Sequence, residues 1–107
     1  MSDQQFRRKI QILVEFSLGK EDFRKLLNVL VEWSKEKKVM TFWDIMETLY
    51  KQKDSIGFEK YFKNTYWVHN KPFDILLERD IGLLHAANIL TSNGNGFAMN
   101  LTFNSAV

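Results

Sequence analysis

The chain has 107 residues and a formal net charge of +2, with 45% apolar and 26% charged residues. These proportions are ordinary for a globular protein, and the length suits one domain, residues 1–107. The absence of cysteine excludes disulfides, thiolate metal sites and thiol nucleophiles. No apolar run approaches the roughly 18 residues needed to cross a bilayer, and no signal peptide is predicted, so we expect a cytoplasmic protein without a membrane partner.

Positive charge is concentrated in the first two thirds of the chain. Residues 1–71 hold 14 basic and 10 acidic side chains, a net charge of +4, whereas residues 72–107 hold one arginine and three carboxylates, a net charge of −2. This balance is too mild to require a nucleic-acid ligand, but it places any basic surface before residue 72.

The first predicted elements are a strand and a long helix. Residues 10–18 place apolar side chains at alternate positions, which favours a β-strand. Apolar residues within 6–14 also share a helical face, so a helix stays open as the alternative. Residues 20–38 predict a helix, because their apolar side chains recur at i, i+3, i+4 and i+7 and their acidic and basic residues suit the helix dipole.

Two more helices are predicted in the middle of the chain. Thr41 is a suitable N-cap for a helix over residues 42–50, and residues 39–40 could form a very short strand before it. An aromatic stripe within residues 58–66 predicts a further helix, which Ser55 could cap.

The C-terminal third predicts a helix and a hairpin. Pro72 suits the first turn of a helix over residues 72–81, and Gly82 is a natural stop. Residues 84–91 and 97–103 predict two strands, because Asn-Gly pairs in the intervening "SNGNG" are strong hairpin signals. We therefore predict a helix-rich α+β domain that ends in an antiparallel β-hairpin.

The order of these elements resembles the winged helix-turn-helix superfamily. The resemblance rests on "VMTFWDIMETL" for the second helix, "FDILLERDIGLL" for the third and "SNGNG" as the tip of the wing, and it covers about two thirds of the chain. It implies a DNA-binding domain whose third helix enters the major groove. Residues 51–71 depart from the family because they are too long for its usual turn. The third helix would also present three carboxylates to phosphates, which argues against groove reading by that helix.

Catalysis and metal binding are not predicted. His69 and His85 are the only histidines, and no paired spacing supports a metal site. The sequence has no G-x-S-x-G motif, and "SNGNG" lacks the lysine of a phosphate-binding loop. Asp44 and Glu47 lie three residues apart on one helix, where we interpret them as solvated. We expect a protein that is not an enzyme and that uses no cofactor.

The first functional hypothesis is a small nucleic-acid-binding regulator. Lysines would contact the phosphate backbone, and asparagines at the wing tip would probe the minor groove. Two of these lysines lie close in sequence to Tyr66 and Trp67, a combination that can also stack on bases. The predicted contact residues are Lys35, Lys37, Lys38, Lys51, Lys53, Lys60, Lys63, Asn93 and Asn95.

The second hypothesis is a protein-interaction module on the same winged-helix-like scaffold. Tyr and Trp anchor many protein interfaces, so an exposed aromatic and acidic surface would supply the contact. Its predicted residues are Tyr66, Trp67, Phe73, Asp74, Glu78 and Asp80. A homodimer is plausible under either hypothesis. Ordinary core packing and solvated helix faces explain the same residues without any ligand.

Overall fold

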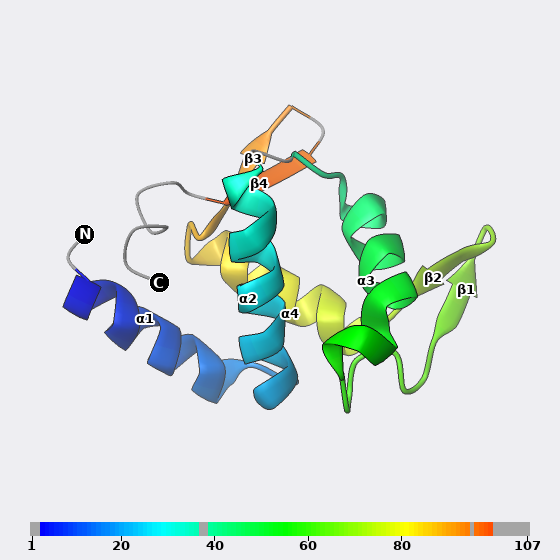
Figure 1. The fold of residues 1–107 in the computed structure, drawn as a ribbon, viewed down its shortest axis with the longest axis horizontal. Helices are drawn as coiled ribbons and strands as arrows, with labels where there is room; N and C mark the ends of the chain where they lie inside the picture. Colours follow the sequence, from blue (N-terminus) through cyan, green and yellow to red (C-terminus); the bar gives the residue numbers. More distant parts are fainter. Residues whose placement is uncertain (1–2, 37–38, 95, 100–107) are drawn as a thin grey trace.

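The structure, a computed structural model, describes residues 3–36, 39–94 and 96–99 (Figure 1). Over these residues the chain forms a single helix-rich α+β domain, as predicted, with two antiparallel hairpins. The elements in chain order are α1 (Asp3–Phe16), α2 (Glu21–Lys35), α3 (Phe42–Ile56), β1 (Tyr66–Val68), β2 (Lys71–Phe73), α4 (Ile75–Ala86), β3 (Leu90–Asn93) and β4 (Gly96–Met99).

The hydrophobic core lies between α2, α3 and α4. Helix α2 buries the stripe that its i, i+3, i+4, i+7 spacing predicted, and the helix begins and ends close to the predicted bounds. Each fully buried leucine or phenylalanine contributes about 1.5–3 kcal/mol relative to an exposed one. The largest fully buried apolar side chains are Phe23, Leu26, Ile45, Met46, Leu49, Leu77, Leu84, Ile89 and Leu90.

Residues 10–18 do not form the strand that we favoured. Most of them belong to α1, which packs Phe6 and Val14 into the core. The alternating residues Ile12 and Phe16 lie on the opposite, exposed side of the helix. The two periods overlap over this short segment, and burial of the helical face against the neighbouring helices decides between them.

Helix α3 begins where the sequence predicted and ends later. Thr41 is its N-cap, and a capping box forms, since the Asp44 N–H donates to the Thr41 hydroxyl (3.1 Å) and the Thr41 N–H donates to the Asp44 carboxylate (3.4 Å). The helix continues to Ile56 and ends at Gly57, whose φ of 84° is left-handed. The predicted helix with Ser55 as its cap is therefore wrong, because Ser55 lies inside α3 and turns follow.

The predicted helix start at Pro72 is also wrong. Pro72 lies in β2 opposite Trp67, and α4 starts three residues later behind its N-cap, Asp74. Helix α4 does not stop at Gly82, as the sequence predicted, but continues to Ala86. A glycine inside a helix costs about 1 kcal/mol, and the buried residues Ile81 and Leu84 on either side offset that cost.

The C-terminal hairpin is confirmed in the described residues. Asn93 pairs with Gly96, and Gly94 at the turn has a φ of 63°. Strand β3 starts only at Leu90, because α4 takes up the first part of the predicted strand. A Cβ on Gly96 would lie 3.0 Å from the Met40 carbonyl oxygen, so β4 lies close to Met40, which forms an isolated β-bridge. Residues 100–103 of the predicted second strand lie outside the described residues.

Candidate nucleic-acid interface

Asp22 lies inside the domain and is held by backbone amides. Its carboxylate accepts hydrogen bonds of 2.6–3.1 Å from the N–H groups of Glu59, Lys60 and Tyr61. A buried carboxylate needs such donors to replace its water. The bonds fix the start of α2 to the segment that follows α3.

Asp80 connects α4 to the loop between α1 and α2. It accepts hydrogen bonds from the N–H groups of Leu18 (2.8 Å) and Gly19 (2.9 Å) and from the hydroxyl of Tyr61. Burial raises the pKa of that tyrosine above its usual range, and the hydrogen bond to Asp80 raises it further. A Cβ on Gly19 would lie 2.5 Å from the Tyr61 ring, so this approach requires glycine.

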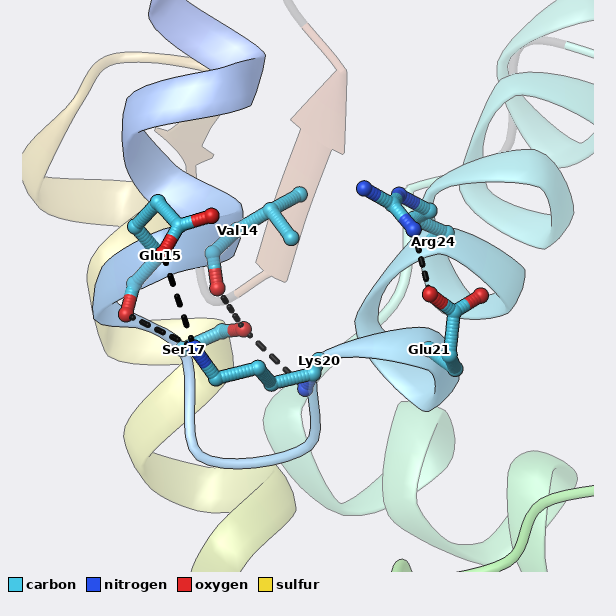
Figure 2. Close-up of polar contacts among 6 residues, drawn as sticks. All are labelled: Val14, Glu15, Ser17, Lys20, Glu21 and Arg24. Carbon is cyan, nitrogen blue, oxygen red and sulfur yellow. Dashed lines mark hydrogen bonds and ion pairs between the residues drawn. The ribbon is translucent and has the colours of Figure 1, made fainter.

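The same loop also makes local polar contacts (Figure 2). The Ser17 hydroxyl donates to the Val14 carbonyl oxygen (2.7 Å) and accepts from the Lys20 N–H (3.1 Å). The Lys20 ammonium lies 3.7 Å from Glu15, and Arg24 pairs with Glu21 on the first turns of α2.

Asp74 closes the base of the β1–β2 hairpin. Its carboxylate accepts from the Leu77 N–H at 2.9 Å, which caps α4. Burial raises its pKa, while hydrogen bonds from the backbone of Leu77, Phe62 and Leu76 act in the opposite direction. Asp74 therefore fixes the start of α4 directly after β2.

These contacts correct the predicted acidic surface. Asp74 and Asp80 are buried, so only Glu78 of the three expected carboxylates lies at the surface. The outward side of α4 also carries the exposed Arg79, which balances the charge of Glu78. Two of the three carboxylates expected to face phosphates are therefore inside the domain, and they cannot repel a bound duplex at the surface. Within the described ranges, no group of three acidic or histidine side chains is placed to bind a metal ion.

The β1–β2 hairpin projects from the domain beside α3 (Figure 1). Tyr66 and Trp67 are 59% and 58% exposed. Residues 60–73 contain Lys60, Lys63 and Lys71 but no aspartate or glutamate. None of these lysines makes an ion pair within the part of the chain that the structure describes. Lys60, Lys63, Tyr66, Trp67 and Lys71 are called the hairpin surface below.

The two faces of this hairpin differ. Side chains alternate between faces, so Tyr66 and Val68 share one face with Lys71, the cross-strand neighbour of Val68. Trp67 points to the other face, where its ring meets Tyr50 of α3 edge-on at 5.3 Å. Phe73, the cross-strand neighbour of Tyr66, packs against Phe42 and Trp43, so both faces of the hairpin contact α3.

The other lysines predicted to bind phosphate are paired or remote. Lys35, Lys51 and Lys53 form exposed ion pairs with Glu32 (3.0 Å), Glu47 (3.1 Å) and Asp54 (3.4 Å). Lys35 lies at the end of α2, whereas the backbone N–H of Lys60 bonds to Asp22 at the start of α2. The length of this helix, about 20 Å, therefore separates Lys35 from the backbone of Lys60. Lys37, Lys38 and Asn95 lie outside the described residues, and Asn93 ends β3.

Phe73 and the two histidines complete the predicted residues. Phe73 is half-buried against Phe42 and Trp43, with ring centroids 6.3 and 6.0 Å away, and so belongs partly to the core. His69 lies in the turn of the β1–β2 hairpin, and His85 hydrogen-bonds to Ser92 at 3.0 Å.

No family model, curated protein or solved structure matches this chain. In the ranges that the structure describes, no helix has both the length and the apolar character needed to cross a membrane.

Proposed function

We propose that the protein is a small non-enzymatic regulator that binds nucleic acid through the hairpin surface. Two observations carry this proposal. Among the described residues, Lys60 and Lys63 just before the hairpin and Lys71 within it make no ion pair, and the projecting hairpin carries two exposed rings. Lysines bind phosphates and release their counterions, while aromatic rings stack on bases of any sequence. Carboxylates, which would repel phosphates, are absent from residues 60–73.

The winged-helix-like order of the elements supports the same proposal. Helix α2, the bridge at Met40, α3, α4 and the β3–β4 hairpin follow one another as in that superfamily. The β1–β2 hairpin occupies the long insertion between the second and third of these helices. We propose that the insertion, rather than α4, makes the main contact, because the surface of α4 has little net positive charge.

Binding to a labelled generic duplex, followed by fluorescence anisotropy across a salt series, tests this proposal. The logarithm of affinity should fall linearly with the logarithm of salt concentration, with a slope of about −0.9 for each phosphate contacted. Lys63→Glu and Lys71→Glu should each weaken binding and make the slope shallower. Lys35→Glu is the matched control, since that lysine lies near the far end of α2. Lack of binding at low salt, or an equal loss in the control variant, would refute the proposal.

The exposure of Tyr66 and Trp67 also favours a second candidate, a protein-interaction module. Exposed Tyr and Trp side chains dominate many protein interfaces. Under this candidate, capture of a protein partner should be lost in Trp67→Ala, retained in Lys63→Glu and nearly insensitive to salt. Capture that is lost in Lys63→Glu and that weakens as salt concentration rises would instead support nucleic-acid binding.

A further inference from the structure

Helix α1 exposes apolar side chains on the side that faces away from the core. Ile12 is 50% exposed and Phe16 is 72% exposed, and Leu18 just beyond the helix is 41% exposed. Beside them lies an open hollow of about 310 Å³ lined by Phe16, Leu18, Arg79, Asp80, Gly82 and Leu83. Large apolar side chains gathered at one surface are typical of an interaction site.

The charges around this surface form a pattern with both signs. At 100° per residue, Arg8, Ile12 and Phe16 lie on successive turns of one stripe, and Glu15 lies beside the same stripe. Arg8 lies about one turn before Ile12 and Glu15 about one turn after it. Both lie on the same side of a line drawn along the helix through Ile12. All four side chains are exposed.

We propose that α1 pairs with α1 of a second copy of the chain, antiparallel about a two-fold axis at Ile12. Such an axis brings Ile12 of the two copies together and places Arg8 of each copy opposite Glu15 of the other. Two identical ion pairs then flank an apolar centre, as a two-fold interface requires. Lys9 lies on the other side of the stripe and is half-buried. On the Arg8 side, one arginine and one glutamate at these positions complement each other across the two-fold axis.

The present contacts leave both charges available. Arg8 makes no ion pair within the described residues. Glu15 pairs with Lys20 at 3.7 Å, and both side chains are mostly exposed (Figure 2). Exposed pairs of this kind contribute only about 0–1 kcal/mol, so Glu15 can exchange Lys20 for an arginine across the interface. A single pair of 14-residue helices gives a small interface, and we expect a dimer that dissociates on dilution.

Sedimentation velocity of the full chain over a concentration series tests the pairing by charge reversal. The wild-type chain should pass from monomer to dimer as concentration rises. Arg8→Glu and Glu15→Arg should each stay monomeric, because each variant places like charges opposite one another. An equimolar mixture of these two variants should dimerise, since one carries two negative and the other two positive side chains at the paired positions. The double variant should dimerise alone.

Arg7→Glu is the matched control, because Arg7 is exposed but lies away from the Ile12 stripe, and it should dimerise like the wild type. Circular dichroism of each variant checks that the helices are retained. A wild-type chain that stays monomeric at all concentrations would overturn the proposal. So would a dimer that is indifferent to charge reversal, or a mixture that fails to recover it. These measurements contain no nucleic acid, so their failure would leave the proposed function untouched.

Discussion

The two hairpins of this domain differ in what surrounds them. The β3–β4 hairpin lies beside the helices, with Leu90 buried and Gly96 close to the backbone of Met40. The β1–β2 hairpin projects outward (Figure 1). Tyr66 and Trp67 keep more than half of their surface exposed. Neighbouring residues restrict which side chains fit in the packed hairpin. In the projecting hairpin, side chains that contact solvent can contact a ligand instead. Substitutions in β3–β4 should therefore lower the stability of the domain, whereas substitutions in β1–β2 should lower its affinity for a ligand.

The largest expected effect is that of Gly96→Val in the packed hairpin. The new Cβ would lie 2.9 Å from Cγ1 of Val39 and 3.0 Å from the Met40 carbonyl oxygen, so backbone would have to shift. We expect a loss of about 2–3 kcal/mol in the free energy of unfolding, measured by urea denaturation. Gly82→Ala is the control, because nothing lies within 4 Å of its Cβ and alanine should stabilise α4 by up to about 1 kcal/mol. Equal effects of the two changes would contradict the close packing of β4.

The turns of the two hairpins should also respond differently. Gly94 has a φ of 63°, and Gly94→Ala should cost about 1 kcal/mol of stability, because a Cβ disfavours the left-handed region. Asn70 already occupies that region at a φ of 64°, so Asn70→Gly should change stability by less than about 0.5 kcal/mol. Thermal denaturation of the two variants under one condition gives the comparison. A larger effect at Asn70 would show that the projecting turn is the more constrained of the two.

Trp67→Ala should separate binding from stability in the projecting hairpin. The substitution removes the edge-on contact with Tyr50, and such aromatic pairs contribute about 0.5–1.5 kcal/mol, so we expect a loss near the lower end for this exposed ring. Affinity for a single-stranded oligonucleotide should fall in the same variant, because one stacking ring is gone. Cooperative unfolding by urea supplies the stability and anisotropy supplies the affinity. Global unfolding of Trp67→Ala would mean that β1–β2 belongs to the core.

The smallest effect at neutral pH is expected for Asp74→Asn at the base of the projecting hairpin. Asparagine can still accept the hydrogen bond that caps α4. The pKa of Asp74 is raised by burial, so the folded state binds its proton more tightly than the unfolded state does. The contribution of Asp74 to stability is thus present below the ordinary aspartate pKa and is lost as pH rises through the raised value. The free energy of unfolding of the wild type, relative to that of Asp74→Asn, should therefore fall as pH rises through the raised pKa. A relative value that does not change with pH would contradict this prediction.

Local signals in the sequence predicted the parts of the fold that depend on neighbouring residues. The cap at Thr41 acts over three residues, and the turn at Gly94 acts over four, so both could be found from sequence. The β1–β2 turn was missed because His69 and Asn70 adopt positive φ without a glycine. A strand was favoured over helix α1, which stayed open as the alternative, because the apolar residues of this segment also fall on alternate positions.

The candidate site was predicted only in part, for a similar reason. Lys60, Lys63, Tyr66 and Trp67 adjoin in sequence, so their combination of charge and rings was visible there. Whether Asp80 is a surface charge depends on amides 61 and 62 residues earlier in the chain, and no local pattern reports such a partner. Asp74 did carry a usable signal, because it stands directly before an apolar helix in the position of an N-cap.

The bond between Asp80 and the α1–α2 loop has a consequence for synthesis of the protein on the ribosome. The amides of Leu18 and Gly19 emerge some sixty residues before the carboxylate that they bind. Contacts this distant in sequence form late, since a long loop must close first. The angle between α1 and α2 is therefore fixed only after α4 has left the exit tunnel, and nascent chains cut short before that helix should not acquire the native arrangement of their first two helices.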